Sequence, residues 1–179
     1  MKVQVIYTSL TGCTKRLAEA IYNAVPGEKS IHDLADGVPQ LDGDILLLGY
    51  WGISGGPDPD TQAFLRTVSG KVVGVFCTLG YYCDTAHGRQ TLETGLNLLK
   101  DRNEVLGGFV ANGAVAKHLM QGQGKDGTKA PTEQKELRWE TMKNHPTAAE
   151  CALAAERFTE RIALYERSQA LHIPFQSIL

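Results

Sequence analysis

Hydroxyl side chains and a glycine gather directly after the first strand-like segment of the chain. Residues 3–7 are β-branched or aromatic, and the loop that follows reads Thr8-Ser9-Leu10-Thr11-Gly12-Cys13-Thr14. Helical spacing of apolar residues predicts a helix from about residue 12 to residue 24. The first N–H groups of a helix have no acceptor within it, and its dipole favours a negative charge there. The loop therefore has the chemistry of a phosphate site.

This loop would bind a phosphate through neutral groups, because no lysine or arginine precedes Lys15. Hydroxyls and backbone amides alone suit a buried monophosphate. The loop lacks the Gly-Lys-Ser/Thr of a Walker A motif and the GxGxxG of a dinucleotide-binding turn. A plain N-cap with extra hydroxyl groups has the same sequence, so the loop alone leaves both interpretations open.

Aromatic residues and glycines follow the next two buried strands. Residues 45–50 form a continuous apolar run that ends in Tyr50-Trp51-Gly52, and the strand over 71–77 leads into Thr78-Leu79-Gly80-Tyr81-Tyr82. In an open α/β sheet, ligands bind beyond the carboxyl ends of the strands. A tryptophan beside glycines, on a loop outside the core, suits stacking on a flat ring. The alternative is that Trp51 folds back to cover the sheet.

The three loops together resemble those of the flavodoxin family. Ser9-Leu10-Thr11-Gly12-Cys13-Thr14 resembles the family's phosphate loop, Ser/Thr-x-Thr-Gly-Asn-Thr, with Cys13 in place of the usual asparagine. That change costs one side-chain hydrogen bond to the phosphate and leaves the backbone N–H. Trp51-Gly52 resembles the loop that stacks on the isoalloxazine ring and offers a peptide group to the flavin N5. The loop over 78–82 resembles the third flavin loop, in which Tyr81 or Tyr82 would supply a second aromatic ring.

The resemblance implies FMN as the cofactor, with no side chain in a catalytic role and no metal. The residues implied to bind FMN come from all three loops: Thr8, Ser9, Leu10, Thr11, Gly12, Cys13, Thr14, Tyr50, Trp51, Gly52, Thr78, Leu79, Gly80, Tyr81 and Tyr82. The combination of the loops also resembles small flavodoxin-family proteins that accompany a bacterial bilirubin reductase.

Strands alternate with amphipathic helices along the chain, and the strands are apolar throughout, which indicates a parallel sheet covered on both faces. The expected fold class is α/β: a flavodoxin-like three-layer sandwich whose five-stranded parallel sheet has the order 2-1-3-4-5. We expect a single domain over residues 1–168 and a C-terminal tail over 169–179. Residues 114–146 lie outside the resemblance as an insertion. A segment of this length without clear structure tends to be functional.

Composition excludes several classes of protein. The chain has 179 residues, a formal net charge of −2 and 21% charged residues. This balance provides no electrostatic footprint for nucleic acid and excludes a disordered chain. No apolar run approaches the roughly 20 residues of a membrane span, and no signal peptide is recognisable. The four cysteines are widely spaced and show no metal-binding pattern. We expect a cytoplasmic protein, either a monomer or a weak dimer.

These features favour an FMN-binding protein that transfers electrons to a redox partner protein, either a reductase or an electron acceptor. Two alternatives stay open. One is an FMN-dependent NAD(P)H:quinone-type reductase, for which residues 114–146 are the candidate pocket wall. The other is a flavin-free flavodoxin-like interaction protein. Cys83 and Arg89 match the Cys-x5-Arg spacing of tyrosine phosphatases, but the loop between them has no glycine before Gly88, and chance is the better explanation.

Overall fold

The structure, a computed structural model, describes residues 1–120 and 131–177. Its centre is a parallel sheet in the order β2-β1-β3-β5-β6, and a short β4 pairs antiparallel with the end of β3. The strands are β1 (Val3–Tyr7), β2 (Lys29–Asp33), β3 (Ile45–Ile53), β4 (Gly56–Pro57), β5 (Val72–Leu79) and β6 (Glu104–Asn112). Apart from β4, the five strands have the predicted order, so the expected fold class is confirmed.

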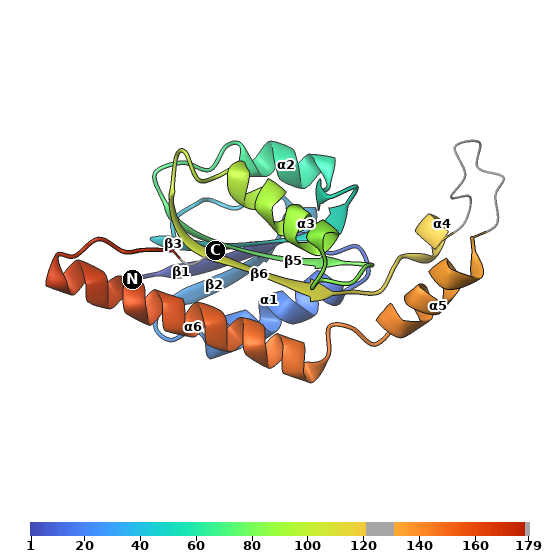
Figure 1. The fold of residues 1–179 in the computed structure, drawn as a ribbon. Helices are drawn as coiled ribbons and strands as arrows, with labels where there is room; N and C mark the ends of the chain where they lie inside the picture. The colour runs from blue at the N-terminus through green and yellow to red at the C-terminus, as the bar shows by residue number, and fades with distance from the viewer. Residues whose placement is uncertain (121–130, 178–179) are drawn as a thin grey trace.

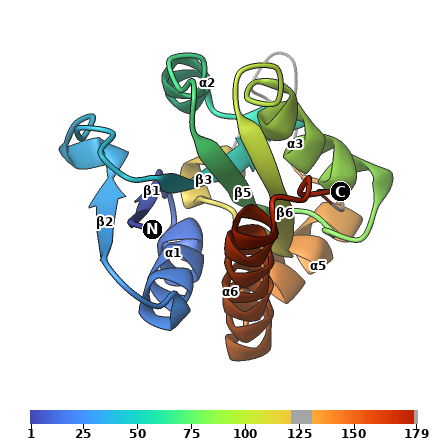
Figure 2. The same ribbon diagram turned by 90° about the vertical axis from the view of Figure 1, so that its left-hand side faces the viewer.

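Helices cover both faces of this sheet (Figures 1 and 2). They are α1 (Cys13–Ala24), α2 (Pro59–Leu65), α3 (Ala86–Asn97), α4 (Lys117–Met120), α5 (Glu133–Met142) and α6 (Ala148–Leu171), with a 3-10 turn η1 (Leu34–Asp36) after β2. Helices α1 and α6 bury Leu17, Ile21 and Phe158 against one face of the sheet. Helices α2 and α3 bury Phe64 and Leu96 against the other. Strands with two covered faces must be apolar throughout, as the sequence indicated.

Local sequence signals determine where several helices begin. Gly12 precedes α1 with a φ of 84°, a left-handed conformation that glycine adopts without strain. Asp58 accepts a hydrogen bond from the Thr61 N–H at the start of α2, with Pro59 in the first helical position. At α6 the Thr147 hydroxyl and the Glu150 carboxylate form a complete capping box.

The segment after β6 leaves the sandwich. Helices α4 and α5 lie beyond the carboxyl end of the sheet and to one side of it (Figure 1). The chain returns through α5, and Thr147 then caps the start of α6. Helix α6 runs to Leu171, and His172 follows in a left-handed conformation. The ring of Phe175 then packs edge-on against Tyr165, with 5.5 Å between ring centroids, so the described part of the expected tail contacts the core.

Within the two ranges that the structure covers, no helix is both long and apolar enough to cross a membrane.

The capping box of α6 makes stability depend on pH. Burial raises the pKa of the Glu150 carboxyl, but hydrogen bonds from the Thr147 N–H and from His145 outweigh it, so the pKa lies below its ordinary value of 4.5. A carboxyl whose pKa is lower in the folded protein than in the unfolded chain stabilises the fold at pH values above its unfolded-state pKa. This stabilisation is lost as the pH falls through the folded-state pKa.

We therefore expect Glu150→Gln to lower the free energy of unfolding by about 1 kcal/mol at neutral pH. The difference from the native protein should shrink as the pH falls below 4.5, the ordinary value of the carboxyl pKa. Urea unfolding across this pH range measures it. Glu156→Gln, an exposed change on the same helix, is the control, and an equal effect of both variants would contradict the role of Glu150.

Candidate functional site

The three predicted loops meet at one pocket at the carboxyl end of the sheet. Its volume is about 240 Å³. Residues of all three loops line it, together with residues after β6 and on α5: Leu10, Thr11, Trp51, Gly52, Ile53, Thr78, Leu79, Gly80, Tyr81, His87, Gly113, Ala114, Val115, Ala116, Leu119, Arg138 and Trp139. The chain has two tryptophans, and both line this pocket. The three loops lie close together because β1, β3 and β5 pair in parallel, so that all three strands end at the same edge of the sheet.

The first loop presents unpaired donors beside the pocket. The backbone N–H groups of Gly12, Cys13 and Thr14 have no acceptor among the residues that the structure describes. The next N–H, of Lys15, donates to the Ser9 hydroxyl at 3.2 Å. Thr11 lines the pocket and is exposed. An anion at this position would meet the positive end of the α1 dipole and backbone donors that have no other partner.

All three threonine hydroxyls of this loop already have partners, and that of Thr11 lies 3.1 Å from Cys13 Sγ and 3.3 Å from the Ala114 carbonyl oxygen. Thr8 Oγ1 lies 3.3 Å from Asp58 Oδ2 and 3.0 Å from Thr61 Oγ1, so it connects the loop to the start of α2. Thr14 Oγ1 is 2.9 Å from Thr78 Oγ1, and both residues are buried. One of these two hydroxyls donates to the other, which leaves a single proton of the pair for another acceptor. Thr8 thus faces α2 rather than the pocket.

The second loop is shorter than the sequence indicated, because β3 continues through Ile53. Trp51 pairs with Thr78 of β5, and Gly52 pairs with Pro57 of β4. Trp51 therefore belongs to the strand and is held by its backbone. Its side chain is half-buried and lines the pocket.

The side chain of Tyr50 lies in the core and not at the pocket. Its side chain is fully buried in the core beside α3, and its hydroxyl donates to the Thr91 carbonyl oxygen at 2.7 Å. Successive residues of a strand point to opposite faces, so Tyr50 and Trp51 cannot both face the pocket. The side chain of Tyr50, a residue predicted to bind the cofactor, therefore faces the core and does not line the pocket.

The third loop brings Tyr81 to the pocket, whereas Tyr82 is 42% exposed and is not part of its lining. Aromatic and cationic neighbours surround the Tyr81 ring. The His87 ring packs edge-on at 5.3 Å between centroids, and the Arg138 guanidinium lies 4.4 Å from the ring centroid. A cation held over an aromatic face in this way is attracted by the ring quadrupole. The sequence left the choice between the two tyrosines open.

The segment after β6 forms one wall of the pocket, but the sequence did not indicate which of its residues line the pocket. Ala114, Val115 and Trp139 carry no motif, and the helical pattern around residue 139 is ambiguous. Gly80 shows how closely this wall approaches the third loop, because a Cβ at Gly80 would lie 2.1 Å from Val115 Cγ2. The expectation that residues 114–146 form a pocket wall agrees with this geometry where the segment is described; residues 121–130 lie outside the described residues.

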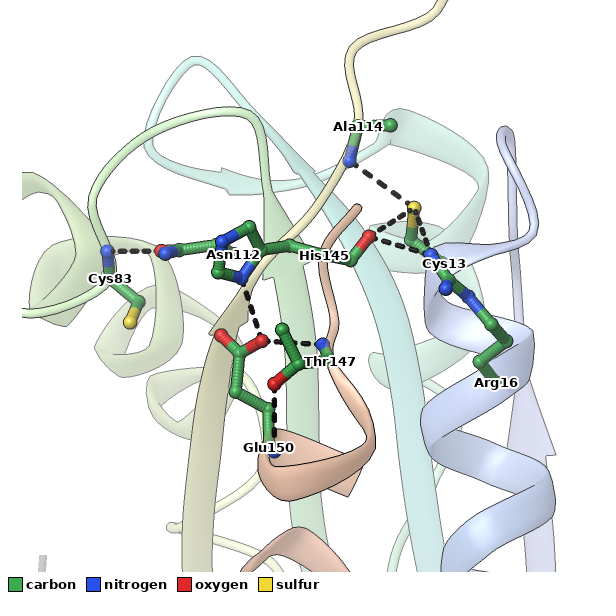
Figure 3. Close-up of polar contacts among 8 residues, drawn as sticks. All are labelled: Cys13, Arg16, Cys83, Asn112, Ala114, His145, Thr147 and Glu150. Carbon is green, nitrogen blue, oxygen red and sulfur yellow. Dashed lines mark hydrogen bonds and ion pairs between the residues drawn. The ribbon is translucent and has the colours of Figure 1, made fainter. Parts of the chain in front are cut away.

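A polar network connects this wall to the first loop (Figure 3). Cys13 Sγ contacts the Ala114 N–H and the His145 carbonyl oxygen at 3.2 and 3.3 Å. The side chain of His145 in turn lies 2.7 Å from Glu150 through Nδ1. At the end of β6, the side-chain oxygen of Asn112 accepts a hydrogen bond from the Cys83 N–H at 2.8 Å.

The phosphatase alternative has no support in this geometry. Cys83 and Arg89 do line one pocket, but burial raises the pKa of the Cys83 thiol, and the nearby carboxylates of Glu150 and Asp84 raise it further. A nucleophilic cysteine needs a lowered pKa. Among the described residues, no group of three or more His, Cys, Asp or Glu side chains could hold a metal ion.

Comparison with known proteins identifies the family. A family model described as a flavodoxin domain matches residues 4–159. The chain belongs to the flavodoxin family. This is a family of FMN-type electron-transfer flavoproteins. This chain is 33% identical over 123 residues to the flavodoxin-like domain-containing protein BilS of Clostridioides difficile. The match covers 66% of this chain and 70% of that protein.

Solved structures show the same flavodoxin fold. A Fusobacterium nucleatum flavodoxin bound to flavin mononucleotide matches 93% of this chain and 98% of its own, with a TM-score of 0.55 and 14% identity. The metal-soaked Flv1 flavodiiron core from Synechocystis matches 94% of this chain with a TM-score of 0.57 and 15% identity. This chain spans 36% of that longer protein. At these identities the likeness concerns the fold alone.

The cysteines of this flavodoxin should differ in reactivity. Complete burial raises the pKa of Cys77 to about 12, and partial burial raises the pKa of Cys83 and of Cys151 to a smaller extent. Since the thiolate reacts, we expect iodoacetamide to label Cys83 and Cys151 slowly at neutral pH and faster as the pH rises above 9.0, the ordinary value. Cys77 should stay unlabelled while the protein is folded. Site-resolved mass spectrometry measures this, and labelling of folded Cys77 would contradict its burial.

Proposed function

We propose that this protein binds FMN noncovalently at the pocket and transfers electrons to a partner protein. One observation carries the proposal: a single pocket brings Thr11, directly before the donor-rich start of α1, together with two tryptophans and a tyrosine from separate segments of the chain. A flat, apolar ring with a phosphate tail needs these two environments side by side.

The residues present fit this cofactor in their chemistry. The free N–H groups of residues 12–14 would hold the phosphate, and the Thr11 hydroxyl, which contacts Cys13 Sγ and the Ala114 carbonyl oxygen, would lie beside it. Trp51 and Tyr81 would flank the isoalloxazine ring, and the backbone of the 78–82 loop would meet its polar edge. Leu10, Ile53 and Trp139 extend the apolar lining. Neutral donors suffice for the phosphate because the helix dipole adds a favourable field.

Each group of residues has a separate task in this proposal. Bound FMN would supply the redox chemistry, and the protein would supply its position and electrostatic surroundings. Trp51, Tyr81 and Trp139 would keep water from the ring. The strand pairing of Trp51 with Thr78 would hold the backbone of the tryptophan in place beside the ring.

We favour an electron carrier over an NAD(P)H-dependent reductase, because the three loops resemble those of flavodoxins. Electrons would then leave through the ring edge to a docked protein. The resemblance of the loops makes a bacterial bilirubin reductase the partner to test first.

The cofactor proposal is tested by titrating the purified protein with FMN. We expect a yellow complex, with quenching of tryptophan fluorescence because both tryptophans line the pocket. Gly12→Asp should weaken binding at least about 100-fold, because it puts a negative charge against the phosphate. Tyr81→Ala should weaken it about tenfold and Tyr82→Ala by less than twofold. A protein that stays colourless with excess FMN would refute the proposal and favour a flavin-free interaction protein.

The charge of Arg138 should tune the bound flavin. Reduction adds negative charge to the ring system, and the Arg138 guanidinium lies at the pocket over Tyr81. Removing this cation in Arg138→Gln should therefore make the two-electron midpoint potential more negative by about 30 mV, the equivalent of roughly 1.4 kcal/mol. Arg138→Lys is the control that keeps the charge. Spectroscopic redox titration measures both, and an unchanged potential in Arg138→Gln would place the cation away from the flavin.

A further inference from the structure

The thiol of Cys13 lies where the first loop meets both ends of the 114–146 segment (Figure 3). Its Sγ accepts a hydrogen bond from the Ala114 N–H at 3.2 Å and donates one to the His145 carbonyl oxygen at 3.3 Å. The Arg16 guanidinium donates to the same carbonyl oxygen at 2.7 Å. The Thr11 hydroxyl lies 3.1 Å from Sγ and 3.3 Å from the Ala114 carbonyl oxygen. The first turn of α1 thus holds both ends of the segment.

These two ends carry the wall of the pocket. Ala114 lines the pocket and continues into Val115 and Ala116, which also line it. His145 follows α5, the helix that places Arg138 and Trp139 at the pocket. The position of the wall relative to the first loop is therefore determined where the segment begins and where it ends.

The side chain of His145 also contacts the first turn of α6. Its Nδ1 lies 2.7 Å from Glu150 Oε2, and the Thr147 N–H donates to the same oxygen at 2.6 Å. The end of the segment is therefore held between the first turn of α6 and the first turn of α1. A shift of the His145 backbone would disturb contacts at both helices.

A thiol suits this position for steric and chemical reasons. Cys13 is only 2% exposed, and a thiol both accepts and donates a hydrogen bond within a small volume. The surroundings are tight, because a Cβ built at Gly113 would lie 3.2 Å from Cys13 Cβ. An asparagine, the residue usual in the family's loop, would place its larger amide where the Ala114 N–H and the His145 carbonyl group now lie.

We infer that Cys13 is a positioning residue that couples phosphate binding at the first loop to the placement of the pocket wall. The inference rests on the proposed function for the identity of the phosphate. A phosphate on the N–H groups of Cys13 and Thr14 would fix the backbone that carries the thiol, and through the thiol it would fix Ala114 and His145. Coupling between two sites is reciprocal, so a wall held in place would also strengthen phosphate binding.

Amide hydrogen exchange at Ala114 tests the inference in the full chain, without flavin and then with inorganic phosphate or FMN. We expect exchange to be about fivefold faster in Cys13→Ala, which removes one hydrogen bond to this N–H, and close to native in Cys13→Ser. Phosphate should slow exchange in the native protein and in Cys13→Ser, and much less in Cys13→Ala. The matched control is Cys151→Ala, which removes a half-buried thiol outside the network and should leave Ala114 exchange unchanged.

A second variant tests the contact at the His145 end of the segment. It also keeps the inference testable if Cys13→Ala does not fold. Arg16→Gln removes the guanidinium that donates to the His145 carbonyl oxygen, and we expect iodoacetamide to label Cys13 about fivefold faster in it. Equal Ala114 exchange in the native protein and Cys13→Ala, an equal increase in Cys151→Ala, or unchanged Cys13 labelling in Arg16→Gln would overturn the inference. Failure of the native protein to bind FMN would refute the proposed function separately, because the exchange and labelling comparisons use the flavin-free protein.

Discussion

Parallel backbone pairing between β1, β3 and β5 is the interaction on which the whole site depends. The pairing extends past the end of β1, where the Thr8 N–H donates to the Gly49 carbonyl oxygen at 3.0 Å, and it carries β3 far enough to set Trp51 opposite Thr78. Parallel strands end at the same edge of the sheet, so the start of α1 and two aromatic residues that are far apart in the sequence come close together there. The buried faces of the same strands supply the apolar area that keeps this edge rigid.

The segment after β6 differs from the sandwich in what holds it. The sandwich has two apolar cores, one on each face of the sheet. The segment is attached at its two ends by polar contacts to the first turns of α1 and α6, centred on Cys13 and His145. Its buried side chains Trp139 and Met142 belong to neither of these cores. Regions with fewer buried apolar contacts open at lower free energy than the core. A pocket with one wall of this kind can respond to what binds in it while the other walls stay in place.

Charge provides little guidance to a partner at long range. A net charge of −2 over 179 residues produces a weak field, and electrostatic steering needs a concentrated one. Specificity would then depend on short-range contacts around the pocket. Exposed apolar side chains are available there, since Leu10 and Ile53 line the pocket and are 42% and 36% exposed. Arg138 adds a cation to the same surface.

The sequence by itself determined the fold class, the strand order and the three loops, because each depends on local patterns: continuous apolar strands, helix caps such as Asp58-Pro59 and Thr147-x-x-Glu150, and residue types at strand ends. Only the tertiary structure decided which side chains face the pocket. It extended β3 and so turned Tyr50 into the core, it chose Tyr81 over Tyr82, and it brought Trp139 and the Cys13 contacts to the site. These outcomes depend on the facing of a strand and on contacts between residues more than 100 positions apart, which no local pattern encodes.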